Sequence, residues 1–157
     1  MKKEKISVIV PCYNEEESLP IFYEEITKIA KGMKEVDFEF IFINDGSKDN
    51  TLKIIKDLHK KDKRVRFISL SRNFGKEGGM YAGLEYATGD YVAIMDADMQ
   101  DPPSMIVKMY QEIKEHDYDC VALCSQNHKD YTFLRRTFTN IWYKLIAKIS
   151  STPQVPG

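Results

Sequence analysis

Short apolar runs alternate with longer amphipathic stretches along most of this chain. The first run, residues 6–11 ("ISVIVP"), is continuously apolar and rich in β-branched residues. This pattern is typical of a strand that is buried on both faces, and the proline ends it. The same kind of pattern predicts four further strands, at 38–43, 65–70, 91–95 and 119–123.

The stretches between these runs carry apolar residues at helical spacing. Asn14 is placed to cap the first helix, and the glutamates that follow it suit the positive end of a helix dipole. The apolar stripe of this helix consists of Leu19, Phe22, Ile26, Ile29 and Ala30. Further helices are predicted at 52–61, 80–87, from Pro102 to His116, and 131–150.

This alternation predicts an α/β fold, a mostly parallel sheet with helices on both faces. In such sheets ligands bind outside the carboxyl ends of the strands. The loops at that edge read "PCYNEE", "NDGSKDNT", "SRNFGKEGG" and "DADMQDPP". All four are rich in polar, charged or glycine residues, so together they indicate a binding site.

The acidic loop after the fourth strand favours a cation site. Asp96 and Asp98 alternate at the strand end, and Gln100 follows them. Carboxylate and amide oxygens are hard ligands, and Mg²⁺ or Mn²⁺ is usually held by a few of them together with substrate phosphates. A solvated turn is the alternative, and Asp101 is better explained as a helix cap before Pro102.

Two other loops carry candidate binding residues. Asp45 follows the second strand and either forms a turn or accepts a hydrogen bond from a nucleobase. Arg72 and Lys76 bracket the third loop, where they either meet phosphate or stay solvated. Nearby glycines allow the backbone to approach a ligand closely, or they form a helix entry.

Composition narrows the class of protein. The chain has 157 residues, 43% of them hydrophobic, which fits one globular domain. Its net charge of −1 gives no general attraction to nucleic acid. Three cysteines fit buried thiols in a reducing compartment, and no stretch approaches the roughly 20 apolar residues of a membrane span. Walker, dinucleotide, zinc and serine-hydrolase signatures are all missing from the sequence.

In combination, four motifs resemble the family 2 glycosyltransferases, which have the GT-A (Rossmann-like) fold. They are "SVIVPCYNEEESL", "FINDGSKDNT", "LSRNFGKEGGMYAGLEYATGDYV" and "MDADMQDPP". The likeness is greatest to the transferases that act on polyprenyl phosphates, such as dolichol-phosphate mannose synthases and bactoprenol glucosyltransferases. It runs from about Ile6 to Pro103.

The resemblance implies roles for individual residues. Residues implied to contact the nucleotide sugar are Pro11, Tyr13, Asn14, Glu15, Ile43, Asp45, Arg72, Lys76, Asp96, Ala97 and Asp98. The metal would be held by Asp98 and Gln100, with Asp96 beside them. Asp98 is therefore also the catalytic candidate.

The implied reaction is an inverting, metal-dependent transfer of a sugar from a UDP- or GDP-sugar to an acceptor, in cell-envelope glycan synthesis. The metal and basic side chains would stabilise charge on the departing diphosphate. A polyprenyl phosphate acceptor, met at the inner face of the cell membrane, is already ionised and needs no strong base. The alternative is a nucleotide-sugar-binding module without transfer activity. A sugar nucleotidyltransferase is disfavoured, because the first loop lacks glycines.

Two departures from the family pattern bear on the acceptor. Gln126 stands where these transferases usually carry an arginine, which leaves Arg135 and Arg136 as candidate phosphate contacts. Relatives also continue beyond this length, so we expect a single GT-A domain over 1–157 without its acceptor-side portion. The helix at 131–150 either packs on the core or lies on a membrane surface, and an exposed apolar face there would favour homo-oligomers.

Overall fold

The computed structural model describes residues 3–116 and 118–123. Its sheet contains β1 (Glu4–Cys12), β2 (Val36–Asn44), β3 (Val65–Ser69) and β4 (Tyr91–Ile94), all parallel and in the order β3-β2-β1-β4. The helices are α1 (Ser18–Gly32), α2 (Thr51–Lys61), α3 (Lys76–Tyr86) and α4 (Met105–His116). The fold is therefore α/β with a parallel sheet, as the alternating pattern predicted.

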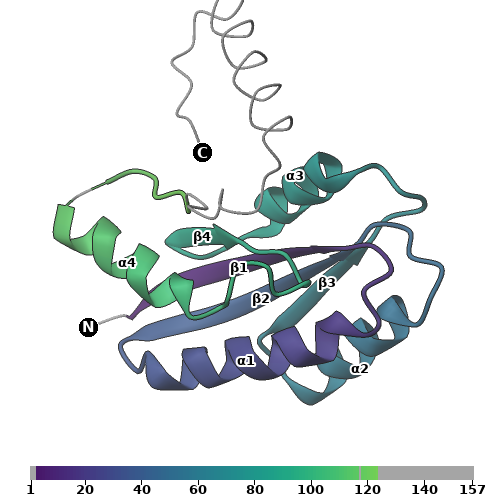
Figure 1. Cartoon of the computed structure of the whole chain (residues 1–157), viewed down its shortest axis with the longest axis horizontal. Coiled ribbons are helices and arrows are strands. Elements are labelled where there is room, and N and C mark those ends of the chain that lie inside the picture. The colour runs from purple at the N-terminus through teal and green to yellow at the C-terminus, as the bar shows by residue number, and fades with distance from the viewer. Residues whose placement is uncertain (1–2, 117, 124–157) are drawn as a thin grey trace, which may run out of the picture. The chain divides into compact units, whose positions relative to one another are not determined.

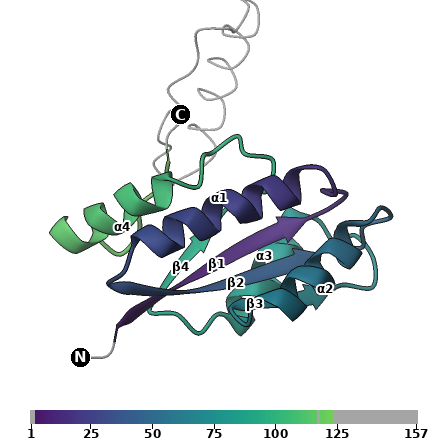
Figure 2. The ribbon, with the colours of Figure 1, turned by 90° about the horizontal axis from the view of Figure 1, so that it is seen from below.

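Helices cover both faces of this sheet (Figures 1 and 2). The stripe of α1 packs with α2 and α4 against one face, where Phe22 and Ile26 meet Phe40 and Phe42 of β2 in the larger core. Helix α3 lies on the opposite face, over a smaller core of Ile9, Ile41 and Ile43. Successive side chains of β1 and β2 thus enter different cores, which explains why both runs are continuously apolar.

The strand order places β1 at the centre, with β2 on one side and β4 on the other. The chain passes from β1 to β2 on one side of the central strand and reaches β4 only after β3 has been added. The loops after β1 and β4 therefore diverge at the carboxyl edge of the sheet. This is the switch point at which open α/β sheets form a ligand crevice.

The starts of α3 and α4 differ from the sequence prediction. Helix α3 begins at Lys76 rather than at residue 80, so part of the predicted glycine-bearing loop is its first turn. Helix α4 begins at Met105, after both prolines, which makes Asp101 too distant to cap it. Apolar periodicity locates the packed face of a helix but not its first turn, which is often polar.

Asn14 was predicted as the cap of α1, and this is wrong. The helix starts at Ser18, and Asn14 has a left-handed backbone with φ of 58°. Its side-chain oxygen instead accepts a hydrogen bond from the backbone N–H of Lys48. The polar residue is used to join two loops, not to begin a helix.

The predicted strand at 119–123 is also wrong. Residues 118–123 form no helix or strand, and Asp119, Cys120 and Ala122 are exposed. A strand depends on hydrogen bonds from a neighbour, and none of the described strands pairs with this segment. A five-residue apolar run did not determine the structure by itself.

The chain divides into two compact units, Met1–Asp117 and Tyr118–Gly157. The first contains the whole sheet and its helices. The expected single domain over 1–157 stays a prediction, and the predicted helix at 131–150 lies outside the described residues, as do Gln126, Arg135 and Arg136. Among the described helices, none is long and apolar enough to cross a bilayer.

Candidate functional site

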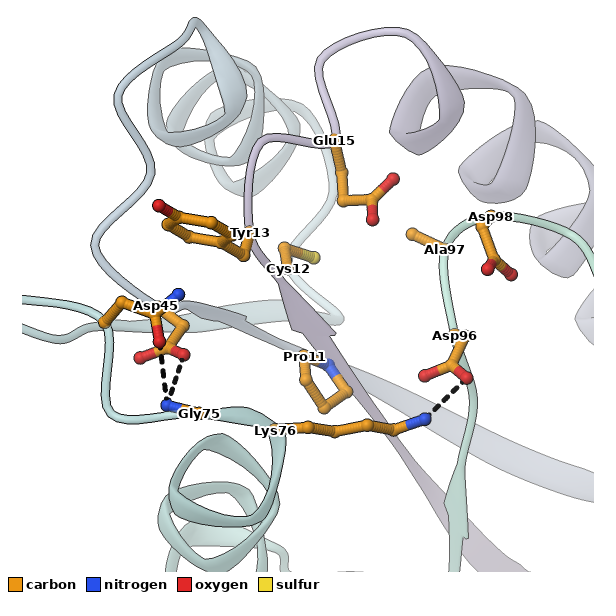
Figure 3. A pocket seen from close by; sticks show the side chains of 11 residues that line it. Pro11, Cys12, Tyr13, Glu15, Asp45, Gly75, Lys76, Asp96, Ala97 and Asp98 are labelled. Atoms are coloured by element: carbon orange, nitrogen blue, oxygen red, sulfur yellow. Dashed lines mark hydrogen bonds and ion pairs between the residues drawn. The ribbon is translucent and has the colours of Figure 1, made fainter.

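A cleft of about 330 Å³ opens at the carboxyl edge of the sheet. It receives residues from the end of β1 and from the loops after β1, β2, β3 and β4 (Figure 3). The lining residues are Pro11, Cys12, Tyr13, Glu15, Asp45, Asn73, Gly75, Lys76, Asp96, Ala97 and Asp98. Segments far apart in the sequence thus meet in one concave site at the switch point.

The loops after β1 and β2 are joined by hydrogen bonds. The N–H of Asn14 donates to the Ser47 hydroxyl at 3.1 Å, and the N–H of Glu15 donates to the Thr51 hydroxyl at 2.7 Å. The left-handed backbone of Asn14 allows this turn, and asparagine tolerates that conformation better than most residues. These bonds hold Tyr13 and Glu15 at the cleft, and the Ser18 hydroxyl bonds to the Glu15 carboxylate.

Asp45 fixes the third loop. The residue is 4% exposed, and its carboxylate accepts the N–H of Phe74 at 2.7 Å and that of Gly75 at 2.9 Å. It makes this contact across to another loop, and not within its own turn. A carboxylate can accept about four hydrogen bonds, so capacity remains for a ligand.

Gly46 lets the two loops approach this closely. Its φ is 68°, and a Cβ there would lie 2.5 Å from the carbonyl carbon of Arg72. Any side chain at this position would therefore push the third loop away from Asp45.

Lys76 and Asp96 bridge the cleft. The Lys76 side chain extends past Pro11, and its Nζ lies 2.6 Å from Oδ2 of Asp96 (Figure 3). The two side chains come from opposite walls, since Lys76 begins α3 and Asp96 follows β4. Both remain about half exposed, so solvent and a ligand can compete for them.

The donors near Asp98 fit a hard divalent cation. Asp98 is exposed, and one of its oxygens accepts the N–H of Gln100 at 3.0 Å. Within residues 3–116 and 118–123, no three acidic, histidine or cysteine side chains converge as a metal cage. One or two protein carboxylates completed by substrate phosphates is the usual arrangement for Mg²⁺, so this donor set fits such an ion and not an all-protein site.

Cys12 lines the cleft but is buried, and its thiol is not reactive. Burial raises the pKa of its thiol, and the nearby Glu15 carboxylate acts in the same direction. The neutral thiol donates to the carbonyl of Val10 at 3.3 Å. A protonated thiol is a poor nucleophile and metal ligand.

The structure brings eight of the predicted site residues together in the cleft lining: Pro11, Tyr13, Glu15, Asp45, Lys76, Asp96, Ala97 and Asp98. Four others lie outside the lining. Asn14 joins two loops, Ile43 is buried beneath α3, and Gln100 is exposed beyond Asp98. Arg72 is exposed, with its guanidinium 4.8 Å from the centre of the Phe74 ring.

Sequence reasoning missed Cys12 and Asn73 as lining residues, whereas Gly75 is one of the loop glycines expected to let the backbone approach a ligand. The two missed residues lie within loops that were selected, beside residues that were named. Their small or neutral side chains give no chemical signal, and only the folded backbone places them at the cleft.

The strand order and the cleft at the carboxyl edge of the sheet fit the GT-A (Rossmann-like) fold that the four motifs implied. Residues 7–155 match the family described as Glycosyl transferase family 2, and the chain belongs to that family. It is 41% identical over 151 residues to the bactoprenol glucosyl transferase of Shigella phage SfX. It is also 41% identical over 147 residues to the prophage bactoprenol glucosyl transferase homolog of Escherichia coli.

These matches cover 96% and 94% of the chain but 48% and 47% of the two relatives. The chain thus spans about half the length of the curated relatives it matches. The family assignment confirms the resemblance given by the four motifs.

Solved structures show the same fold. A Staphylococcus aureus TarS fragment in complex with UDP superposes with a TM-score of 0.58, at 22% identity, over 80% of this chain and 40% of that one. The mannosyltransferase PcManGT of Pyrobaculum calidifontis, solved with GDP-Man and Mn²⁺, gives a TM-score of 0.54 at 23% identity, over 62% and 28%. At these identities the likeness establishes the fold alone.

Proposed function

We propose that this cleft binds a nucleoside-diphosphate sugar and that the protein transfers the sugar to a lipid phosphate. The observation that carries the proposal is the meeting of eight motif residues in one cleft at the carboxyl edge of the sheet. Membership of a family of glycosyltransferases supports the donor, and the named bactoprenol relatives support a polyprenyl phosphate acceptor.

Each wall of the cleft has a distinct part in this proposal. In this proposal Tyr13 and Asp45 would recognise the base and ribose, and Asp96 would face the ribose hydroxyls. Lys76 would supply positive charge for the diphosphate. Asp98, with Gln100 and Asp96 nearby, would hold Mg²⁺ or Mn²⁺. Such an ion, when bound, neutralises charge on the departing diphosphate.

An inverting transfer follows from an in-line attack on the anomeric carbon. An ionised lipid phosphate can make this attack without a strong base, and the described cleft offers carboxylates but no histidine. The acceptor would be met at the inner face of the cell membrane. Nucleic acid is not an expected partner, because the net charge is −1.

Titration calorimetry of the full chain tests the donor. UDP, GDP and their sugars are titrated with and without Mn²⁺, and we expect metal-linked binding of at least one nucleotide. Failure of every nucleoside diphosphate to bind would overturn the proposal.

A second assay tests transfer. Radiolabelled donor is incubated with an undecaprenyl phosphate in detergent, and labelled lipid is expected. Binding without labelled lipid would instead support the alternative, a nucleotide-sugar-binding module without transfer activity.

A further inference from the structure

The Lys76–Asp96 ion pair joins two walls of the cleft that the donor would enter. Its two atoms are 2.6 Å apart and join the start of α3 to the loop after β4. The proposed function needs both groups for other contacts: the carboxylate for ribose hydroxyls and the amine for diphosphate. Neither contact is fully available while the two groups bind each other.

The charges of the other lining residues increase the need for Lys76 at the diphosphate. Four carboxylates line the described cleft, on Glu15, Asp45, Asp96 and Asp98, and Lys76 is the one basic side chain among the lining residues. A diphosphate that enters such a cleft meets strong repulsion unless cations offset it. Lys76 is the protein group that can supply this charge.

The backbone beneath Lys76 is fixed. Asp45 holds the N–H groups of Phe74 and Gly75, and Gly79 donates its N–H to the carbonyl of Gly75 at 3.1 Å as α3 begins. Movement at this point is therefore confined to the flexible lysine side chain, which is 54% exposed. Exposed ion pairs are weak, so a phosphate with more charge can displace the carboxylate.

We propose that Lys76 is an exchange residue: it neutralises Asp96 in the free protein and moves to the donor diphosphate when ribose takes its place on Asp96. This inference rests on the proposed function, since it assumes a nucleotide in the cleft. It assigns Lys76 a positioning role before binding and a phosphate contact after it.

The exchange predicts opposite effects on two ligands. In Lys76→Met, a nucleoside no longer has to displace the amine from Asp96, so its affinity rises by up to about fivefold, the range expected of an exposed pair. The matching nucleoside diphosphate loses a charge-assisted contact, so its affinity falls by roughly tenfold or more. A lysine that merely supports the fold would change both affinities in one direction.

The test is an NMR titration of the ¹⁵N-labelled full chain, which detects millimolar binding. Uridine and UDP, and guanosine and GDP, are titrated against wild type, Lys76→Met, Lys76→Arg and the control Lys56→Met. Lys56 is exposed on α2 and lies outside the cleft lining. Lys56→Met therefore changes the net charge by the same amount as Lys76→Met without altering the cleft. We expect Lys76→Arg to retain diphosphate binding and the control to match wild type.

A second measurement follows the amine itself. After ¹³C-methylation of lysines, the Lys76 signal should differ between wild type and Asp96→Asn in the free protein. With the nucleoside diphosphate bound, the two signals should coincide, because Lys76 has left position 96. A difference that persists in the bound state would overturn the exchange.

The outcomes separate the two proposals. If wild type binds no nucleoside diphosphate, the proposed function fails and the exchange fails with it. If wild type binds UDP or GDP but Lys76→Met leaves that affinity unchanged, or weakens nucleoside and diphosphate alike, the exchange alone is overturned.

Discussion

At each end of α3, a buried carboxylate from β2 or the residue after it accepts backbone N–H groups of the adjoining segment. Only one of these ends faces the cleft. At the start of α3, Asp45 accepts the N–H groups of Phe74 and Gly75. Beyond its end, Glu39 accepts the N–H of Thr88 at 2.7 Å. Both carboxylates follow or belong to β2, and each residue is 4% exposed.

The far end is the more completely satisfied. Glu39 also accepts the Ser7 hydroxyl at 2.6 Å and Nη1 of Arg66 at 3.2 Å, and Lys5 lies 3.3 Å away. Burial alone would raise the pKa of Glu39, but the bonds from Ser7, Thr88 and Arg66 outweigh it and lower the pKa to about 2. This end of α3 thus has no capacity left for a ligand.

The comparison teaches that one device serves two purposes. A buried carboxylate with every partner in the protein fixes the chain, whereas one at the cleft fixes the chain and keeps capacity for a ligand. Each carboxylate has a glycine nearby where two backbone segments come close together. Gly46 lies against the backbone of Arg72, and Gly89 lies against the backbone of Lys5 and Ser7. We therefore expect substitutions at the two ends of α3 to differ in their effects on the free energy of unfolding and on nucleotide binding.

Gly46→Ala should have the largest effect, and Gly89→Ala is its counterpart at the far end of α3. Gly46→Ala adds a Cβ 2.5 Å from Arg72 backbone at a φ of 68°, so we expect a loss of roughly 2–5 kcal/mol from strain and overpacking. Gly89→Ala places a Cβ 2.7 Å from backbone atoms of Lys5 and Ser7 and should cost about 1–3 kcal/mol. Urea unfolding measures both.

Nucleotide binding separates the two glycine variants. In the folded fraction, Gly46→Ala should also weaken UDP or GDP binding, because the third loop moves from Asp45. Gly89→Ala should leave the affinity unchanged. Equal loss of affinity in both variants would show that the two ends of α3 are not functionally distinct.

Removing the carboxylates should have smaller effects than Gly46→Ala. Glu39→Ala leaves the buried Ser7 hydroxyl and the Thr88 N–H without their acceptor, which should cost about 2–3 kcal/mol. Asp45→Ala should cost about 1–2 kcal/mol, because Gly75 keeps a bond to Asn73.

Nucleotide affinity should also distinguish the Asp45→Ala and Glu39→Ala variants. Asp45→Ala should weaken nucleotide affinity by roughly tenfold even without metal, the scale of one lost charge-assisted bond. Glu39→Ala should retain the wild-type affinity. Calorimetry without metal checks both, and a Glu39→Ala protein that folds but binds weakly would contradict the comparison.

The dependence of stability on acid pH tests the contribution of Glu39, the carboxylate at the far end of α3. The folded pKa of Glu39, about 2, lies below its ordinary value of 4.5, so the stability it contributes is present above about pH 4.5 and is lost as the pH falls towards 2. Glu39→Gln cannot titrate. We therefore expect its deficit against wild type, from urea unfolding, to be largest at pH 7 and to shrink by pH 3. A constant deficit would show that the charge of Glu39 is unimportant.

Local pattern predicted much of this fold but not the bonds that join its loops. The four strands and the stripe of α1 were recovered within one or two residues, because burial on two faces leaves a direct trace in the sequence. Glu39 interrupts the run "FEFIFI", and such a charge signals a buried partner, yet nothing local identifies Ser7 or Thr88. The contact of Asp45 with a loop 30 residues away is likewise invisible to periodicity.

The candidate site was predictable to the extent that its loops follow strands. Topology brings strand ends together, so Asp45, Lys76 and Asp98 could be expected on one rim. Periodicity gave the wrong start for α3 and the wrong use of Asn14, because both depend on how neighbouring loops pack. The pairing of Lys76 with Asp96 required the actual separation of the two walls.

Asp98 should give the smallest effect on stability, and it sharpens the comparison from within the cleft. Its side chain is exposed, and its described hydrogen bond is to the N–H of Gln100 nearby, so Asp98→Ala should change unfolding by no more than about 0.5 kcal/mol. The variant should nevertheless lose the increase in nucleotide affinity that Mn²⁺ gives, as measured by paired titrations with and without metal. Asp45 would then be a cleft carboxylate that serves both fold and ligand, and Asp98 one that serves the ligand alone. A stable Asp98→Ala protein that keeps its full response to metal would move the cation site elsewhere in the cleft.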